Sequence, residues 1–283
     1  MARAGVGTTN RTDERGPGAP GTGGTTTAAR AERRPWEWIT LVAYIVMIGI
    51  NALANWLPLA GRSTGEISDR FPVYVTPAGY AFSIWSLIYL ALAVFVVYQL
   101  LPAQRNRRLD TTRRLFVLSS VFNVAWLFSW HYLQIPLSQV MMFGLLFTLI
   151  AIYVHVRRNP DTATGYHRWI TRVPFSLYLG WISVASLVNI AVVLYDLGPL
   201  QAEQWNVTWT VIVLAVLTLL TLWILRAGRD VVFAGVALWA FVGILVANQG
   251  ETLLVVASTA AAVLVALGII FAFTRNRDRP LLS

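Results

Sequence analysis

Aromatic rings and carboxamides recur along one face of three apolar segments of this sequence. In the segment "TPAGYAFSIWSLIY", residues 76–89, Phe82, Trp85 and Tyr89 are spaced i, i+3 and i+7, so they share one face of a helix. Such side chains hold ligands by ring stacking and by hydrogen bonding, without covalent chemistry. The same periodicity gives two further stripes in later segments: Asn123, Trp126 and Trp130, then Tyr178, Trp181, Ala185 and Asn189.

These stripes have two possible explanations, a structural role in the membrane or a ligand pocket, and the position of three tryptophans helps to choose between them. Trp and Tyr favour membrane interfaces, and intramembrane Asn and Ser often only join helices by hydrogen bonds. Trp85, Trp126 and Trp181, however, lie within their segments and not at the ends. Rings from three separate segments suit an apolar pocket for a flat, mostly apolar ligand. Joining helices remains the alternative role for each amide, including Asn51 and Asn55.

Other catalytic and metal-binding chemistry has little support in the sequence. Cysteine is absent, which removes thiolate catalysis, Fe–S clusters and Cys-based zinc sites. The histidines, His131, His155 and His167, form no H-x-x-x-H motif. His131 could ligate a haem iron, but a solvated interfacial role suits a lone His at a helix end better. We therefore assign no catalytic residue, no metal site and no required cofactor.

The composition is that of an integral membrane protein. Of 283 residues, 57% are hydrophobic and 12% are charged, and the mean hydropathy is +0.61. A soluble domain would carry about a quarter charged residues. The net charge of +9 comes from 22 arginines that lie mostly between long apolar runs. Because the positive-inside rule produces such clusters, we expect no nucleic-acid partner.

The apolar segments predict an all-α, eight-helix transmembrane bundle. The arginine clusters fall on alternate sides of successive segments, which predicts a multi-pass protein of the inner (cytoplasmic) membrane with both termini in the cytoplasm. Large apolar side chains are nearly absent before residue 35, which predicts a disordered tail. The eight segments are residues 36–59, 79–101, 113–132, 137–156, 170–194, 205–225, 231–248 and 252–273.

The longest external connection, residues 61–75, comes directly before the first stripe. It contains Glu66, Asp69 and Arg70. Three roles remain open for these charges: a solvated turn, ties that hold down a lid, or partners for propionate or cationic groups of an entering ligand.

The stripes resemble motifs of the TspO/MBR family, the tryptophan-rich sensory proteins related to the mitochondrial translocator protein or peripheral benzodiazepine receptor. Tyr80 and Phe82 sit one position past the first Trp and the Phe of the family's second-helix motif, Pro-Pro-x-Trp-Val-Phe-x-x-Val-Trp-Thr-x-x-Tyr. That motif matches directly at Pro77, Trp85, Ser86 and Tyr89. The third-helix and fifth-helix motifs match at Asn123 and Trp126, and at Trp181, Ala185, Ser186 and Asn189.

The resemblance covers residues 36–195 and implies a five-helix bundle with a pocket near the helix 1–2 loop. It implies that the pocket binds tetrapyrroles, such as protoporphyrin or haem, and in some members sterols or synthetic aromatic ligands. Some bacterial members are reported to break down protoporphyrin with tryptophans that would correspond to Trp85 and Trp181. Stripes and resemblance together predict these ligand-binding residues: Tyr80, Phe82, Trp85, Tyr89, Asn123, Trp126, Trp130, Tyr178, Trp181 and Asn189.

Two features depart from the family pattern. The loop "STGEISDRFPVYVTPAGY" lacks the family's Trp-x-Pro-Pro character, so we expect an altered pocket lid. Helices 6–8 have no counterpart in five-helix members; we expect a docked scaffold or a replacement for their dimer contact, and a homodimer stays open. The expected parts are a tail (1–34), a TspO-like five-helix domain (35–196), three additional helices (197–274) and a cytoplasmic tail (275–283).

These observations predict a membrane receptor or sensory protein that binds a tetrapyrrole-like or other apolar polycyclic ligand within the bilayer. A transporter for a small apolar metabolite is one alternative, without ion coupling because no Asp, Glu or Arg falls in the middle of a predicted helix. A porphyrin-degrading enzyme is the other. It would need ring chemistry at Trp85 and Trp181, since no general acid or base falls in the predicted pocket.

Overall fold

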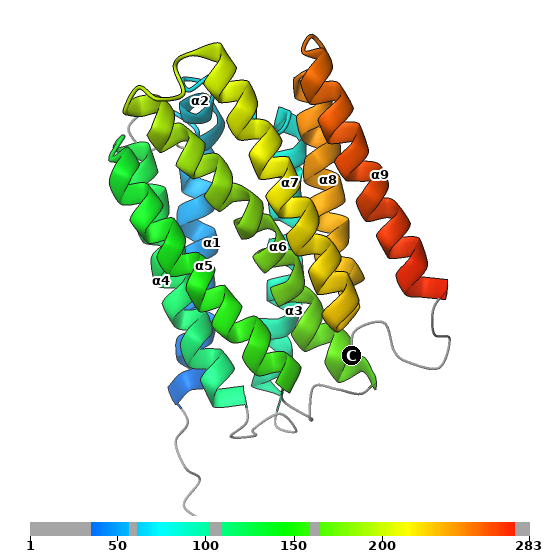
Figure 1. The fold of residues 1–283 in the computed structure, drawn as a ribbon. Helices are drawn as coiled ribbons and strands as arrows, with labels where there is room; N and C mark the ends of the chain where they lie inside the picture. Colours follow the sequence, from blue (N-terminus) through cyan, green and yellow to red (C-terminus); the bar gives the residue numbers. More distant parts are fainter. Residues whose placement is uncertain (1–34, 57–60, 102–108, 159–164, 275–283) are drawn as a thin grey trace, which may run out of the picture. The chain divides into compact units, whose positions relative to one another are not determined.

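The described residues of the computed structural model fold into helices joined by turns, without a strand. These residues are 35–56, 61–101, 109–158 and 165–274, and the expected tails lie outside them. The all-α prediction is confirmed for this part of the chain (Figure 1). The helices are α1 (Pro35–Trp56), α2 (Thr64–Ser68), the 3₁₀ helix η2 (Gly79–Ser83), α3 (Ile84–Leu100), α4 (Asp110–His131), α5 (Ile135–Arg158), α6 (Gly165–Asp196), α7 (Glu203–Gly228), α8 (Val231–Ala247) and α9 (Thr252–Thr274).

Within the described residues, six helical stretches are long and apolar enough to cross a membrane. They lie in α1, η2 with α3, α5, α6, α7 and α9. Helix α8 is apolar but has only 17 residues, which is a length of roughly 25 Å. Helix α4 carries Asp110, Arg113 and Arg114 near its start, and three buried Ser side chains and the buried Asn123 further on. The chain is therefore a multi-pass membrane protein.

Helix α6 is the most buried of the candidate spans and packs on four other long helices. It contacts α3, α5, α7 and α8, and 67% of its apolar span is buried. By contrast, α9 packs on α7 and α8 and is only 22% buried, as a helix with a wide lipid-facing surface would be. Figure 1 shows α9 at the edge of the helices and α6 among them.

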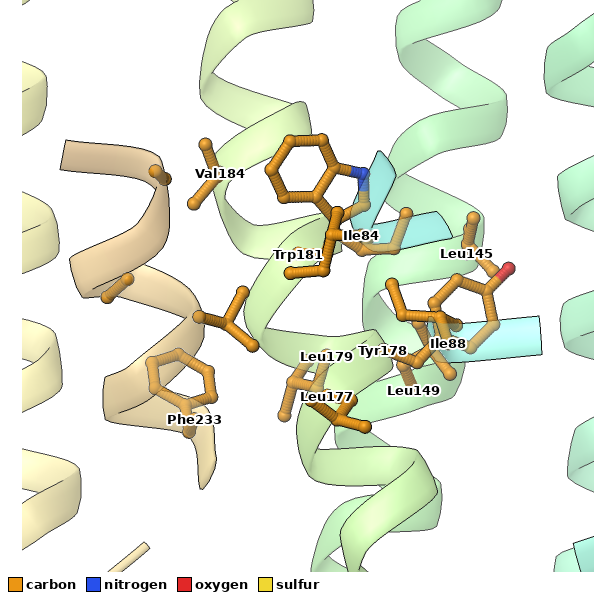
Figure 2. Close-up of a cluster of buried hydrophobic side chains, with 14 of the residues drawn as sticks. Ile84, Ile88, Leu145, Leu149, Leu177, Tyr178, Leu179, Trp181, Val184 and Phe233 are labelled. Atoms are coloured by element: carbon orange, nitrogen blue, oxygen red, sulfur yellow. The ribbon is translucent and has the colours of Figure 1, made fainter. Parts of the chain in front are cut away.

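Close packing on both sides of α6 joins the N-terminal and C-terminal helices. In Figure 2, Tyr178 of α6 lies beside Leu145 of α5, and Phe233 of α8 lies on the opposite side of α6. At Gly180 a Cβ atom would lie 3.0 Å from the Cβ of Val236, so α6 and α8 approach closely there. Small residues allow such approach, and van der Waals contact then drives association in a bilayer.

A buried arginine ties together α1, α3 and α4 at one end of the bundle. The Arg113 Nε donates to Gln99 Oε1 (2.8 Å), and its guanidinium pairs with Asp110 Oδ1 (2.7 Å) and Glu37 Oε1 (3.5 Å). The Arg113 side chain is completely buried. Burying this cation is tolerated because two carboxylates and an amide surround it.

A second ion pair ties α5, α6 and the α7–α8 turn together. Arg157 pairs with Asp230 Oδ2 (2.7 Å), which also accepts the hydroxyl hydrogen of Ser176 (2.7 Å). The Arg157 guanidinium donates to the Gly228 carbonyl, and Arg172 donates to the Arg157 carbonyl. These contacts gather arginine-rich helix ends on one side, which we call the arginine end; the opposite side is the cavity end.

Candidate functional site

Two hollows that share part of their walls lie at the cavity end. The main chamber has a volume of about 550 Å³ and lies among α1, α2, η2, α3 and α4. The aromatic cleft has a volume of about 60 Å³ and reaches between α3, α4, α5 and α6. Both are lined by Thr64, Ser68, Pro77, Phe82, Trp85 and Trp126.

Trp85 stands where the two hollows meet, and its ring is held by three neighbours. It stacks on Tyr89 with a centroid distance of 5.3 Å and meets the edges of Tyr178 (5.9 Å) and Trp181 (6.4 Å). Phe82 meets Trp181 edge-on at 5.7 Å. Edge-to-face and offset pairs of this kind each contribute about 0.5–1.5 kcal/mol beyond area burial. The rings of α3 and α6 therefore form one rigid wall.

The α4 stripe supplies the facing wall. Trp126 and Trp130 are stacked with a centroid distance of 6.0 Å and an interplanar angle of 25°. Their indole nitrogens point to different partners: Trp126 Nε1 donates to Asn189 Oδ1 (3.1 Å), and Trp130 Nε1 donates to the Thr64 carbonyl (3.3 Å). Hydrogen bonding thus fixes both ring planes at the cleft.

The amides of the stripes hold helices together. Asn123 is fully buried, accepts a hydrogen bond from Asn51 (2.8 Å) and donates one to the Tyr178 hydroxyl (2.9 Å). Asn189 lines the cleft, but its amide donates to Gln139 Oε1 (2.9 Å) and to a Ser hydroxyl. Of the two roles open to these amides, the geometry favours joining α1, α4, α5 and α6.

The predicted ligand-binding residues therefore divide into three groups. Tyr80 is 43% exposed and packs edge-on against Trp239 of α8, so the structure does not bring it to either hollow. Asn123 and Tyr178 lie behind the wall, where they support it. The residues that do line a hollow are Phe82, Trp85, Tyr89, Trp126, Trp130, Trp181 and Asn189.

A short helix, α2, lies against both hollows, and we call it the lid helix. The apolar segments of the sequence predict no helix in this loop. In α2 the Ser63 hydroxyl accepts from the Glu66 N–H, and Glu66 Oε2 accepts from the Ser63 N–H (2.6 Å). This is a capping box, and the spacing S-x-x-E in "STGE" signals it in the sequence. The Ser63 contacts, followed by the charge of Arg62, hold the pKa of Glu66 below its usual range. Thr64 and Ser68 of this helix face both hollows.

The main chamber is lined by polar side chains that have no hydrogen-bond partner among the described residues. The hydroxyls of Thr64 and Thr76 are buried and accept or donate no hydrogen bond within the part of the chain that the structure describes, and both residues line the chamber. Asp69, which also lines the chamber, shows no side-chain hydrogen bond or ion pair among the described residues. The two buried hydroxyls need a ligand or water to satisfy them, whereas Asp69 is exposed and its carboxylate is open to solvent.

Helices α7 and α8 hold the loop that forms one wall of the cavity. Asn206 of α7 accepts from the Tyr74 N–H (3.0 Å) and donates to the Pro72 carbonyl (2.8 Å). Asn248 at the end of α8 donates to the Tyr74 carbonyl (2.8 Å). The Tyr74 hydroxyl donates a hydrogen bond to Glu203. Burial, followed by the negative charge of Glu203, raises the pKa of Tyr74. Sequence periodicity gives no signal for these long-range contacts.

Gly243 of α8 brings the wall segment into direct contact with that helix. Its carbonyl accepts from the Ala78 N–H (3.0 Å), and a Cβ atom at this position would lie 2.8 Å from the Pro77 Cβ. Nearby, Trp239 Nε1 donates to the Ala81 carbonyl (2.9 Å). Only a glycine permits this approach, so α8 positions Pro77, which lines both hollows.

Among the described residues, one carboxylate lines a hollow, that of Asp69 in the main chamber, so the expectation that no acid or base falls in the pocket does not hold there. No group of three or more His, Asp or Glu side chains in the described part of the chain could hold a metal ion. His131 is buried, donates through Nδ1 to the Leu127 carbonyl (2.8 Å), and lines neither hollow. The rings and hydrogen-bonding groups that line the two hollows can stack against, enclose and orient a ligand.

Comparison with known families adds one finding. The model of a family described as TSPO-like protein matches residues 37–272. The match extends beyond residues 36–195, where the motifs indicate resemblance, and includes α7, α8 and α9. No curated protein and no solved structure matches the chain.

Proposed function

Because the chain belongs to the TSPO-like protein family, we propose that it is a membrane receptor for a flat, apolar polycyclic ligand. The observation that carries this proposal is the meeting of rings from η2, α3, α4 and α6 at one cavity. Bilayer-facing helices need no such convergence. Pockets that bind small molecules typically combine apolar and aromatic walls with a few polar groups.

The rings would hold the ligand by stacking and by enclosure. A polycycle in the main chamber would lie against Phe82, Trp85 and Trp126, the rings that line both hollows, and one edge would point toward Trp181 in the aromatic cleft. Since these rings are already fixed by one another and by hydrogen bonds, little side-chain freedom is lost on binding. Preorganised walls are what a receptor for a rigid ligand requires.

A tetrapyrrole such as protoporphyrin or haem is one ligand of this class. The ring-lined walls suit the face of a macrocycle. No histidine lines the cleft or the main chamber among the described residues, so these walls offer no imidazole to an iron atom. Protoporphyrin and haem should then bind with similar affinity, because the macrocycle and not the metal is recognised.

The arginine end faces the cytoplasm in this proposal. Arg113, Arg157 and Arg172 lie at that end, as the positive-inside rule requires of a cytoplasmic face. Helices α4 and α8 then also cross the inner membrane, giving eight crossings with both termini inside. The cavity end, with its lid helix, faces outward.

Titration in nanodiscs with protoporphyrin and haem tests the proposal through tryptophan quenching and the Soret band. We expect saturable binding that Trp85→Phe and Trp181→Phe weaken about three- to tenfold, because a phenyl ring has a smaller stacking face than an indole and loses much of an aromatic contact of about 0.5–1.5 kcal/mol. Trp205→Phe is the matched control, since Trp205 is exposed and lines neither hollow.

The same preparations separate the alternatives. Quenching that rises linearly and is identical in all variants would mean partitioning into lipid and would overturn the proposal. Vesicle flux above simple leak would indicate a carrier. Consumption of bound protoporphyrin that is lost in Trp85→Phe while binding persists would indicate an enzyme.

A further inference from the structure

The main chamber and the aromatic cleft differ in chemistry, so they would receive different ends of one ligand. The cleft is walled mostly by rings and aliphatic side chains. Thr64 lines both hollows, and the chamber adds the hydroxyl of Thr76 and the carboxylate of Asp69. The cleft, at about 60 Å³, is too small to hold a polycycle, so the rings would lie in the chamber against the wall that both hollows share, Phe82, Trp85 and Trp126, with one edge directed into the cleft. A ligand placed in this way must be amphipathic, because its polar head then lies in the chamber beside Thr76 and Asp69.

Asp69 is the charged group of the chamber. Among the described residues that line either hollow, no other side chain is acidic and none is basic. Arg62 and Arg70, in the same loop, are exposed and line neither hollow. A ligand head in the chamber therefore meets a negative charge without a compensating cation in the wall.

The lid helix does not explain the presence of this carboxylate. Asp69 is the C-cap residue of α2, and only its backbone N–H takes part in the cap, bonding to the carbonyls of Gly65 and Ile67. A negative charge at a helix C-terminus gains nothing from the helix dipole. Its side chain makes no hydrogen bond or ion pair within the described residues, so it is free to contact a ligand.

Resting on the proposed function, we infer that the receptor prefers a polycyclic ligand whose polar head is a cationic amine. The ammonium would pair with Asp69 and donate to the unpartnered hydroxyls of Thr64 and Thr76. A carboxylate head would meet repulsion at the same place. The inference thus favours aromatic amines over the carboxylate-bearing members of the ligand class.

Three pyrene probes that differ only in the head test this inference: 1-pyrenebutylamine, 1-pyrenebutanol and 1-pyrenebutyric acid. Binding to the full chain is followed by energy transfer from tryptophan to pyrene in maltoside micelles. We expect the amine to bind about tenfold more tightly than the acid, with the alcohol between them, as expected for one partly screened charge pair.

Asp69→Asn should remove the difference in affinity between the amine and the acid. Asp196→Asn, an exposed carboxylate at the same end that lines neither hollow, should leave it unchanged.

The outcomes distinguish this inference from the proposed function. Saturable binding of all three probes that Trp85→Phe weakens, with equal affinities, would overturn the cationic preference and leave the receptor intact. A preference that persists in Asp69→Asn would also overturn it. No saturable binding of any probe would overturn the receptor proposal, and the inference with it.

A soluble aromatic amine and the choline head of a bilayer lipid share this chemistry. Repeating the titration in phosphatidylcholine nanodiscs separates them. If lipid choline occupies the chamber, the preference for the amine should be smaller in nanodiscs than in micelles. If a soluble amine is the natural ligand class, the preference should be equal in both, and Asp69→Asn should abolish it in both.

Discussion

At the scale of single residues, the cavity walls depend on polar groups that never touch the proposed ligand. Asn123 links Asn51 of α1 to Tyr178 of α6, and Tyr178 in turn supports Trp85. Asn189 similarly fixes the ring of Trp126. The tryptophans can form flat, rigid walls because buried amides behind them hold three helices at fixed spacing.

Asn123→Ala should destabilise the fold because it removes two buried interhelical hydrogen bonds, one from Asn51 and one to the Tyr178 hydroxyl, although Asn51 keeps its bond to the Met47 carbonyl. We expect a loss of about 1–2 kcal/mol, at the upper end for interhelical bonds in membranes. The midpoint of SDS-induced unfolding measures it. Leu118→Ala, on the lipid-facing side of the same helix, is the control. Equal midpoints for the two variants would show that the Asn123 bonds carry little stability.

At the scale of elements, the lid helix α2 depends on a carboxylate. The pKa of Glu66 is lowered in the folded chain, chiefly by the Ser63 N–H. Because the pKa of Glu66 is lower in the folded chain than its ordinary value of 4.5, the ionised Glu66 carboxylate stabilises the lid helix at neutral pH. This stabilisation is lost as the pH falls below 4.5 and through the folded pKa.

We therefore expect the affinity for an uncharged probe, 1-pyrenebutanol, to fall as the pH is lowered below about 4.5. In Glu66→Gln, which keeps an oxygen acceptor but cannot titrate, that loss should be absent. Parallel pH profiles for the two proteins would show that the lid does not respond to Glu66.

Helix α8 should control the cavity at a distance through Gly243. A side chain there would collide with Pro77, so Gly243→Val should displace the wall segment and weaken ligand binding about fivefold or more, from overpacking of at least about 1 kcal/mol. Gly235→Val on the same helix is the control, because no atom lies within 4 Å of a Cβ there. If both variants bind ligand alike, α8 does not position the wall.

At the scale of the whole molecule, the sidedness of the bundle is directly testable because the chain contains no cysteine. Gly250→Cys places a thiol in the α8–α9 turn at the cavity end, and Thr274→Cys places one at the end of α9. In intact cells a membrane-impermeant maleimide should label the first variant, and the second only after permeabilisation. The reverse pattern would contradict cytoplasmic placement of the arginine end.

The parts of the molecule that sequence patterns predict are those set by local periodicity. Apolar runs locate the long helices, and a spacing of three or four residues puts Trp85, Trp126 and Trp181 on common faces. Contacts between distant segments leave no such signal. For that reason the lid's position over the cavity, the bonds from Asn206 and Asn248, and the packing of Tyr80 on Trp239 could not be predicted.

The most direct test of the account is to fill the aromatic cleft and measure ligand affinity. Ala185 lines the cleft, and Ala185→Phe should occupy its volume while leaving the membrane-facing surface unchanged. Ala260→Phe on an exposed position of α9 is the control. We predict that the dissociation constant for protoporphyrin rises at least about tenfold in Ala185→Phe and stays at the wild-type value in Ala260→Phe. A folded Ala185→Phe protein that binds protoporphyrin as tightly as wild type would contradict ligand binding in this cavity.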